Sequence, residues 1–283
     1  MKLLLGFYPP TSKVYVIDTV KTLLENSFMN FNSTIPIINS DGKLVGKISK
    51  VKLARWLLDK LVREEPLEKI LYLPISNINL EIDEAKPVEV FELNSETIFT
   101  LLSNKKDYEI YITHDGILIG EFPISSLLYI SSWKSDVRIR IEELPIKELP
   151  MLEHEASIID VLNYLLEIKE PELIGLTFNN NLVGIIMIED ILYYMYNIVE
   201  TKEIDKLKNS KSWIIASPDF SLVYVDESLS KALRVLKRTR DKKFLVVQNR
   251  KEEVLGYINI KDVLLQAKDE ILLKLFTQRI KER

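Results

Sequence analysis

The sequence predicts an α/β (α+β) protein built from four copies of one strand–helix–strand–strand–helix repeat. Three observations predict this fold class. A short phrase that ends in glycine recurs four times, each copy lies between two β-rich runs, and an amphipathic helix precedes and follows each copy. The 283 residues are 47% hydrophobic and 28% charged, a balance typical of a folded chain with a sizeable core.

The recurring phrase predicts four β-hairpins. Its copies cover residues 41–46, 115–120, 179–184 and, more loosely, 251–256, and they end in Gly46, Gly120, Gly184 and Gly256. Apolar runs joined by Asp-Gly or Asn-rich turns are typical of hairpins. Because these runs are apolar nearly throughout, we expect both faces of each strand pair to be covered.

Helical spacing of apolar residues predicts two helices around every hairpin. The helix before it is clearest from Ile158 to Leu165 and from Leu229 to Leu236, and short extended stretches lead into these helices. The cap candidates are Asp18, Asn94 or Ser95, Glu155 and Asp226. The helix after the hairpin has apolar residues at the same offsets from Gly184 and Gly256, and we expect the last helix to run from Ile260 to Ile280.

The recurrence divides the chain into four consecutive repeats, which we group two by two along the sequence. The first pair is predicted to cover residues 1–132, with repeats of 1–66 and 67–132, and the second residues 133–283, with repeats of 133–204 and 205–283. The sequence leaves open whether the pairs close into a disc within one chain or whether the chain forms a homodimer.

The last repeat carries two recognisable segments, residues 241–248 (DKKFLVVQ) and 256–262 (GYINIKD). The second resembles the glycine–apolar–apolar–hydroxyl–x–x–aspartate signature of the CBS domain, named after cystathionine β-synthase. The resemblance covers nearly the whole chain and implies two tandem CBS pairs. Archaeal stand-alone CBS proteins and the gamma subunit of AMP-activated protein kinase are similar.

The resemblance also implies a function and a site. It implies a non-catalytic sensor that binds AMP, ADP or ATP, with S-adenosylmethionine as another ligand of the family. The carboxylates of Asp262 and Asp190 would accept hydrogen bonds from ribose hydroxyls, and a helix N-terminus nearby suits a phosphate. The other expected nucleotide-binding residues are Asn259, Met187, Lys242, Lys243, Phe244, Leu245 and Val223.

Plainer interpretations stand beside this one. Asn259 and Asp262 also fit an ordinary helix cap, and the basic run from Lys231 to Lys243 also fits a solvated helix face. Repeats one and two have Lys52 and Ser126 where the carboxylate is expected, so neither is expected to hold a ribose in the family's usual way.

Composition excludes several other function classes. The chain has no cysteine, so disulfides, thiolate metal sites and cysteine nucleophiles are excluded. No phosphate-binding or hydrolase motif is present, so we expect no enzyme, no catalytic residue, no obligatory cofactor and no metal site. The alternative function is a nucleic-acid-binding or scaffold protein that uses residues 231–243 and the C-terminal helix, although a net charge of −4 argues against nucleic acid.

The expected partners are an adenine nucleotide and a second protein or a second copy of the chain. No apolar run approaches the roughly 20 residues that cross a bilayer. Pro9 and Pro10 interrupt the apolar start, so the expected location is the cytoplasm. Three glutamines among many lysines and glutamates favour a thermophile.

Overall fold

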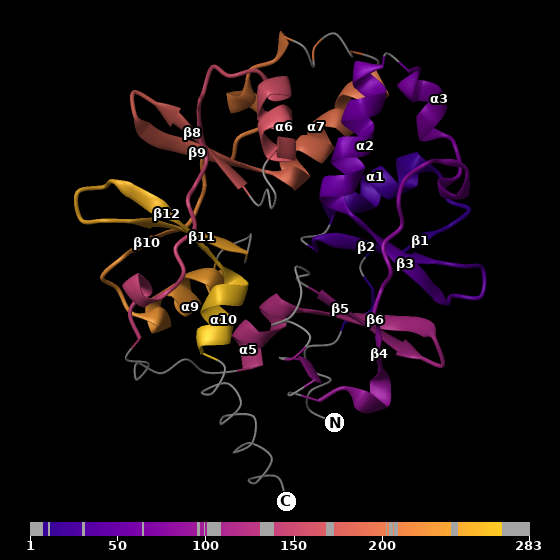
Figure 1. Ribbon diagram of the computed structural model, residues 1–283, viewed down its shortest axis with the longest axis horizontal. Helices are drawn as coiled ribbons and strands as arrows, with labels where there is room; N and C mark the ends of the chain where they lie inside the picture. Colours follow the sequence, from indigo (N-terminus) through magenta and orange to yellow (C-terminus); the bar gives the residue numbers. More distant parts are fainter. Residues whose placement is uncertain are drawn as a thin grey trace, which may run out of the picture.

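The computed structural model describes residues 8–267 except for 11, 30–31, 64, 95–96, 99, 101–108, 131–138, 168–172, 202, 204–205, 207–208 and 239–242. These residues form four units, each with one three-stranded sheet (Figure 1). In every sheet the first strand is parallel to the second, and the second and third form an antiparallel hairpin. The predicted fold class is therefore confirmed.

The four units have the following elements. The first unit contains β1 (Val14–Tyr15), α1 (Val20–Met29), β2 (Thr34–Ile38), β3 (Leu44–Ser49) and α2 (Lys50–Val62). The second contains β4 (Val88–Glu89), β5 (Glu109–His114), β6 (Ile117–Pro123), the 3-10 turn η4 (Ile124–Ser126) and α5 (Leu127–Ile130). The third contains β7 (Met151–Glu153), α6 (Ile158–Glu167), β8 (Leu173–Phe178), β9 (Asn181–Met187) and α7 (Ile188–Thr201). The fourth contains β10 (Leu222–Tyr224), α9 (Leu229–Arg238), β11 (Phe244–Gln248), β12 (Val254–Asn259) and α10 (Ile260–Gln266).

Short elements connect the units. They are α3 (Leu67–Leu71) and the 3-10 turns η2 (Ile75–Asn77), η5 (Ile141–Glu143) and η6 (Ser212–Ile214). A further 3-10 turn, η3 (Val90–Glu92), lies within unit two, directly after β4. The expected boundaries near residues 132 and 204 lie outside the described residues, as does the expected helix beyond Ala267. No helix in the described part of the chain is long and apolar enough to span a membrane.

The predicted helix starts are displaced in three of four cases. Asn94 caps its helix as predicted, because its side chain accepts the N–H of Thr97 at 2.9 Å. The prediction was wrong for Asp18, Glu155 and Asp226. Hydroxyl residues one or two positions further on cap these helices instead, namely Thr19, Ser157 and Ser228. A hydroxyl that directly precedes the first helical residue reaches the third N–H of the helix, whereas a carboxylate placed earlier does not.

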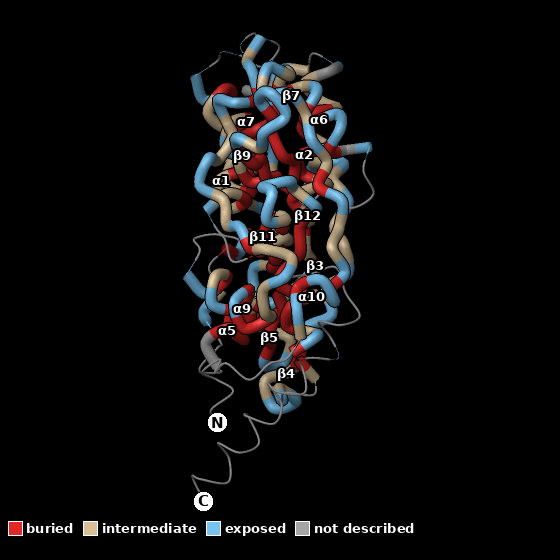
Figure 2. Tube along the Cα trace, turned by 90° about the vertical axis from the view of Figure 1, so that its left-hand side faces the viewer, coloured by how far each residue is buried: buried red, intermediate tan, exposed pale blue. Residues whose placement is uncertain are grey.

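The four units form a flat disc, broad in Figure 1 and narrow when it is turned edge-on in Figure 2. We call units one and two the first half, and units three and four the second half. Two helical interfaces join the halves: α1 and α2 pack on α6 and α7, and α5 and η4 pack on α9 and α10. Each interface contains an extended apolar core.

Backbone exchange joins the two units of each half. The residue after each recurring glycine exchanges two N–H···O=C bonds with the segment that leads into the other unit. The four exchanging pairs are Lys47 with Asp83, Glu121 with Tyr8, Ile185 with Ser217, and Tyr257 with Lys147.

The glycines make this close approach possible. A Cβ atom at Gly46 would lie 2.6 Å from the carbonyl oxygen of Asp83, and one at Gly256 would overlap the carbonyl oxygen of Lys147. At Gly184 the corresponding contact, with the oxygen of Ser217, would measure 3.3 Å. Glycine is therefore required at positions 46 and 256, where another backbone crosses the strand, and the fit is tight at Gly184.

Candidate nucleotide site

The two predicted ribose-binding carboxylates lie at corresponding positions of the second half. Asp190 is in the first turn of α7, Asp262 is in the first turn of α10, and both are half-buried. The Asp190 carboxylate accepts the N–H of Met187 at 2.8 Å. The side chain of Asn259 accepts the N–H of Asp262 at 2.9 Å, so the predicted helix cap is confirmed for Asn259. Capping engages the amide oxygen of Asn259 and leaves the Asp262 carboxylate at the helix end.

The first half lacks this pair of carboxylates. Lys52 occupies the corresponding position in unit one, where its ammonium group contacts Asp83 at 2.5 Å and Glu81 at 2.9 Å. Ser126 occupies it in unit two and is buried. Neither residue supplies the acceptor that a ribose diol needs.

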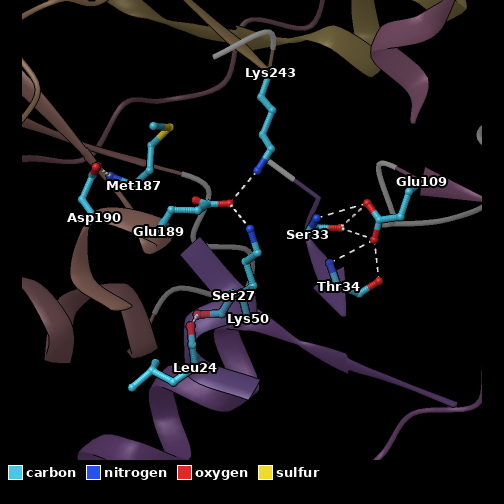
Figure 3. A network of polar contacts seen from close by, with 10 residues as sticks. All are labelled: Leu24, Ser27, Ser33, Thr34, Lys50, Glu109, Met187, Glu189, Asp190 and Lys243. Carbon is cyan, nitrogen blue, oxygen red and sulfur yellow. Dashed lines mark hydrogen bonds and ion pairs between the residues drawn. The ribbon is translucent and has the colours of Figure 1, made fainter. Parts of the chain in front are cut away.

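Lys243 is the predicted phosphate-binding residue that the structure places most clearly. It directly precedes β11, and its backbone oxygen accepts the N–H of Ile260 at 2.7 Å, so it lies beside the start of α10. Its ammonium group points into the disc and donates to Oε1 of Glu189 at 2.7 Å (Figure 3). Lys242, its predicted companion, lies outside the described residues.

A second lysine reaches the same carboxylate from the first half. Lys50, the first residue of α2, donates to Oε1 of Glu189 at 2.9 Å, and its side chain is fully buried. Glu189 and Lys243 are each 8% exposed. Three units therefore contribute to one buried cluster, which we call the central charge cluster: Lys50, Glu189 and Lys243 (Figure 3).

Burial and charge act in opposite directions on this cluster. Burial alone would raise the pKa of the Glu189 carboxyl, but the charges and hydrogen bonds of Lys243 and Lys50 outweigh burial and lower the pKa to about 2. For Lys50 burial is the dominant influence, and it lowers the pKa of the ammonium group to about 8 against the attraction of Glu189. Between about pH 2 and pH 8 the Glu189 carboxylate and the Lys50 ammonium group are therefore both charged.

The predicted apolar residues of the site are packed in the core of the second half. Val223 and Leu245 are 1% and 0% exposed, and Phe244 and Met187 are each 8% exposed. The ring of Phe244 meets that of Tyr257 edge-on, with centroids 5.9 Å apart. These four side chains belong to one buried apolar cluster.

The predicted basic run does not form one continuous surface. Its described members Lys231, Arg234, Lys237 and Arg238 are exposed on α9, whereas Lys243 points into the disc. Lys243 is therefore separated from the exposed cations that the alternative function would use.

In the first half, a carboxylate of the protein itself fills the region between the two hairpins. Glu109 accepts the N–H groups of Ser33 at 3.1 Å and Thr34 at 2.9 Å, as well as both hydroxyl groups (Figure 3). By register from the recurring glycine, Glu109 and Thr34 correspond to Leu173 and Phe244 of the second half. The first half therefore uses this region for an internal polar contact.

Sequence reasoning missed Lys50, Glu189 and Glu109. One signal could have revealed Lys50: it lies four residues after Gly46, and the other three units have isoleucine at the same offset. A lysine at a repeated isoleucine position indicates a buried charge, and a buried charge requires a partner. Glu189 had no such signal, because glutamate in the first turn of a helix is common.

Comparison with known proteins identifies the fold. The CBS domain model matches residues 214–268, which contain all five elements of unit four. Protein MJ1225 from Methanocaldococcus jannaschii, a proposed archaeal homologue of g-AMPK, has a TM-score of 0.77 and 17% identity, over 90% of this chain and 95% of that chain. An uncharacterised conserved protein from Pyrococcus horikoshii has a TM-score of 0.54 and 15% identity, over 92% and 96% of the two chains. A search of curated proteins finds no match.

Proposed function

We propose that this chain of four CBS repeats is a non-catalytic sensor that binds an adenine nucleotide in its second half. The observation that carries the proposal is the position of Asp262. Its carboxylate lies in the first turn of α10, which the strand end at Lys243 contacts through the 2.7 Å bond to Ile260. An acceptor for ribose hydroxyls and a cation for phosphate therefore lie on neighbouring segments.

Each group has a role in this proposal. Asp262 accepts hydrogen bonds from the ribose, and the ammonium group of Lys243 pairs with the phosphate. The backbone of β11 at Phe244 and Leu245 borders the base, and Val223 lies in the neighbouring strand β10, opposite Val247 of β11. Asp190 offers a second, corresponding position in unit three, where Met187 in place of a hydroxyl residue weakens it.

Two further facts support the proposal. The CBS domain model matches unit four, which carries Asp262, and the full-length fold is similar to that of a proposed archaeal homologue of g-AMPK. A sensor also needs a ligand that binds two states of the protein with different affinity. The helical interfaces between the halves are the parts of the disc whose arrangement such a ligand would bias.

Titration calorimetry with AMP, ADP, ATP and S-adenosylmethionine tests the proposal. We expect at least one of the three nucleotides to bind, and Asp262→Ala to weaken that binding by about tenfold to hundredfold, because a charge-assisted hydrogen bond is lost. Asp219→Ala is the matched control, since it removes an exposed aspartate from the same half. Absence of binding by all three nucleotides would refute the proposal.

A further inference from the structure

In the central charge cluster, both ammonium groups donate hydrogen bonds to the same oxygen atom. Oε1 of Glu189 accepts from Lys50 at 2.9 Å and from Lys243 at 2.7 Å. Two ammonium groups that converge on one oxygen form an arrangement that a phosphate oxygen could also occupy. In the structure the protein itself supplies the anion.

The cluster lies next to both candidate ribose positions. Glu189 directly precedes Asp190 in α7, and the backbone oxygen of Lys243 is bonded to Ile260, two residues before Asp262. Both candidate ribose positions thus lie on segments that belong to the cluster or that are hydrogen-bonded to one of its residues.

From this geometry we infer that Glu189 is a specificity-determining residue, an internal carboxylate that competes with the phosphate of a bound nucleotide for Lys50 and Lys243. The inference rests on the proposed function and extends it. A ligand with a phosphate dianion compensates both lysines when it displaces Glu189. A ligand without phosphate leaves the cluster intact and gains nothing from it.

The competition also lowers the affinity for every phosphate-bearing ligand. Part of the attraction between phosphate and lysine is offset because the contact with Glu189 must first be broken. Removal of the carboxylate should therefore strengthen the binding of AMP and leave that of adenosine unchanged. If Glu189 had only a structural role, its removal would not strengthen AMP binding while leaving adenosine binding unchanged.

The test compares Glu189→Gln with Glu200→Gln by calorimetry at pH 7, using AMP and adenosine as probes. Glu200 is the matched control because it lies on the same helix and pairs with Lys21 at 2.7 Å. We expect Glu189→Gln to bind AMP about tenfold to hundredfold more tightly than Glu200→Gln, with equal adenosine affinity. Equal or weaker AMP binding by Glu189→Gln, in a protein whose wild type binds AMP, overturns the inference and leaves the proposed function standing.

A second variant pair covers the case in which Glu189→Gln does not fold, because that change leaves two buried lysines without their carboxylate. Lys50→Ile introduces the residue found at this offset in the other three units, and the double variant Lys50→Ile/Glu189→Gln keeps the summed charge of the cluster at its wild-type value. We expect the double variant to bind AMP about tenfold more tightly than Lys50→Ile alone. Equal affinities overturn the inference. Absence of AMP binding in the wild type and all variants also overturns it, and it overturns the proposed function as well if neither ADP nor ATP binds.

Discussion

The ammonium group of Lys50 lies 2.9 Å from the carboxylate of Glu189, although 139 positions separate the two residues in the sequence. Lys50 begins α2 in the first half and Glu189 lies in the first turn of α7 in the second half. A polar link between the halves thus lies within a predominantly apolar interface. Its charges are stable there because they compensate each other, and removal of one partner of a buried pair typically costs about 3–5 kcal/mol.

The burial of Lys50 predicts a particular pH dependence of stability. The pKa of its ammonium group is about 8 in the folded protein against an ordinary value of 10.5, so the unfolded chain binds more protons between these two pH values. The contribution of Lys50 to the free energy of unfolding should therefore rise as the pH increases from 8 to 10.5. Denaturant unfolding measures this contribution. The free energy of unfolding of the wild type, minus that of Lys50→Ile, should increase by up to about 3 kcal/mol across this pH range.

Lys52 provides the control for this prediction. Burial lowers the pKa of its ammonium group, but the hydrogen bonds and charges of Asp83 and Glu81 outweigh burial and raise the pKa above 10.5. Lys52 is protonated in both the folded and the unfolded protein between pH 8 and about 10. The difference in free energy of unfolding between wild type and Lys52→Ile should therefore not change with pH in this range. If the corresponding difference for Lys50→Ile is equally independent of pH, burial does not lower the pKa of Lys50.

Substitution of Gly256 should be much more harmful than that of a glycine in open surroundings. Gly256 has φ = +145°, and an added Cβ would overlap the carbonyl oxygen of Lys147. We expect Gly256→Ala to destabilise the protein by about 3 kcal/mol or more, from backbone strain and loss of the exchange with Lys147. Gly116→Ala is the comparison, because Gly116 has φ = +78° with nothing within 4 Å of an added Cβ. It should cost about 1–2 kcal/mol, and thermal unfolding of both variants measures the contrast.

Replacement of Glu109 should destabilise the contact between units one and two. Glu109→Leu inserts the residue found at this register in unit three, but it deprives the N–H groups of Ser33 and Thr34 of their carboxylate. Each buried donor that loses its partner costs about 1–3 kcal/mol, so a total of about 3 kcal/mol is expected in equilibrium unfolding. Glu84→Leu, at an exposed carboxylate of the same half, should change stability by less than about 0.5 kcal/mol. Similar values for the two variants would show that Glu109 has no special role.

The cap of α10 can be tested separately from nucleotide binding. Asn259→Ala removes the acceptor for the N–H of Asp262 and should cost about 1 kcal/mol. Asn259→Ser restores a capping hydroxyl, the residue type of the family signature, and should recover most of the loss. If alanine and serine variants unfold at the same temperature, the hydrogen bond at 2.9 Å does not contribute to stability.

The fold was predictable because its signals are local. Hairpin turns, glycine spacing and helical periodicity all lie within one repeat, and their fourfold recurrence strengthens each of them. The reason for the glycines was not visible, since it depends on a backbone that crosses from another unit. The caps were misplaced for a smaller reason: acidic residues were preferred to the hydroxyls of Thr19, Ser157 and Ser228 that directly precede the helices.

The site was predictable only in part. Asp190, Asp262 and Asn259 could be placed at the start of a helix because they belong to one short signature, and their role in nucleotide binding stays a prediction. The contact of Lys243 with Glu189 joins residues 54 positions apart, and that of Lys50 with Glu189 depends on how the halves meet. No pattern within a single repeat encodes such a contact.

The backbone exchange beside the recurring glycines has an evolutionary consequence. In the first half Tyr8 exchanges backbone hydrogen bonds with Glu121, and Asp83 does so with Lys47. In the second half Lys147 exchanges them with Tyr257, and Ser217 does so with Ile185. Both partners of every exchange thus lie in the same half. A single repeat taken alone would present an unpaired strand edge, which invites aggregation. The pair of repeats is therefore the smallest unit that a gene could duplicate, delete or transplant with both of its exchanges intact.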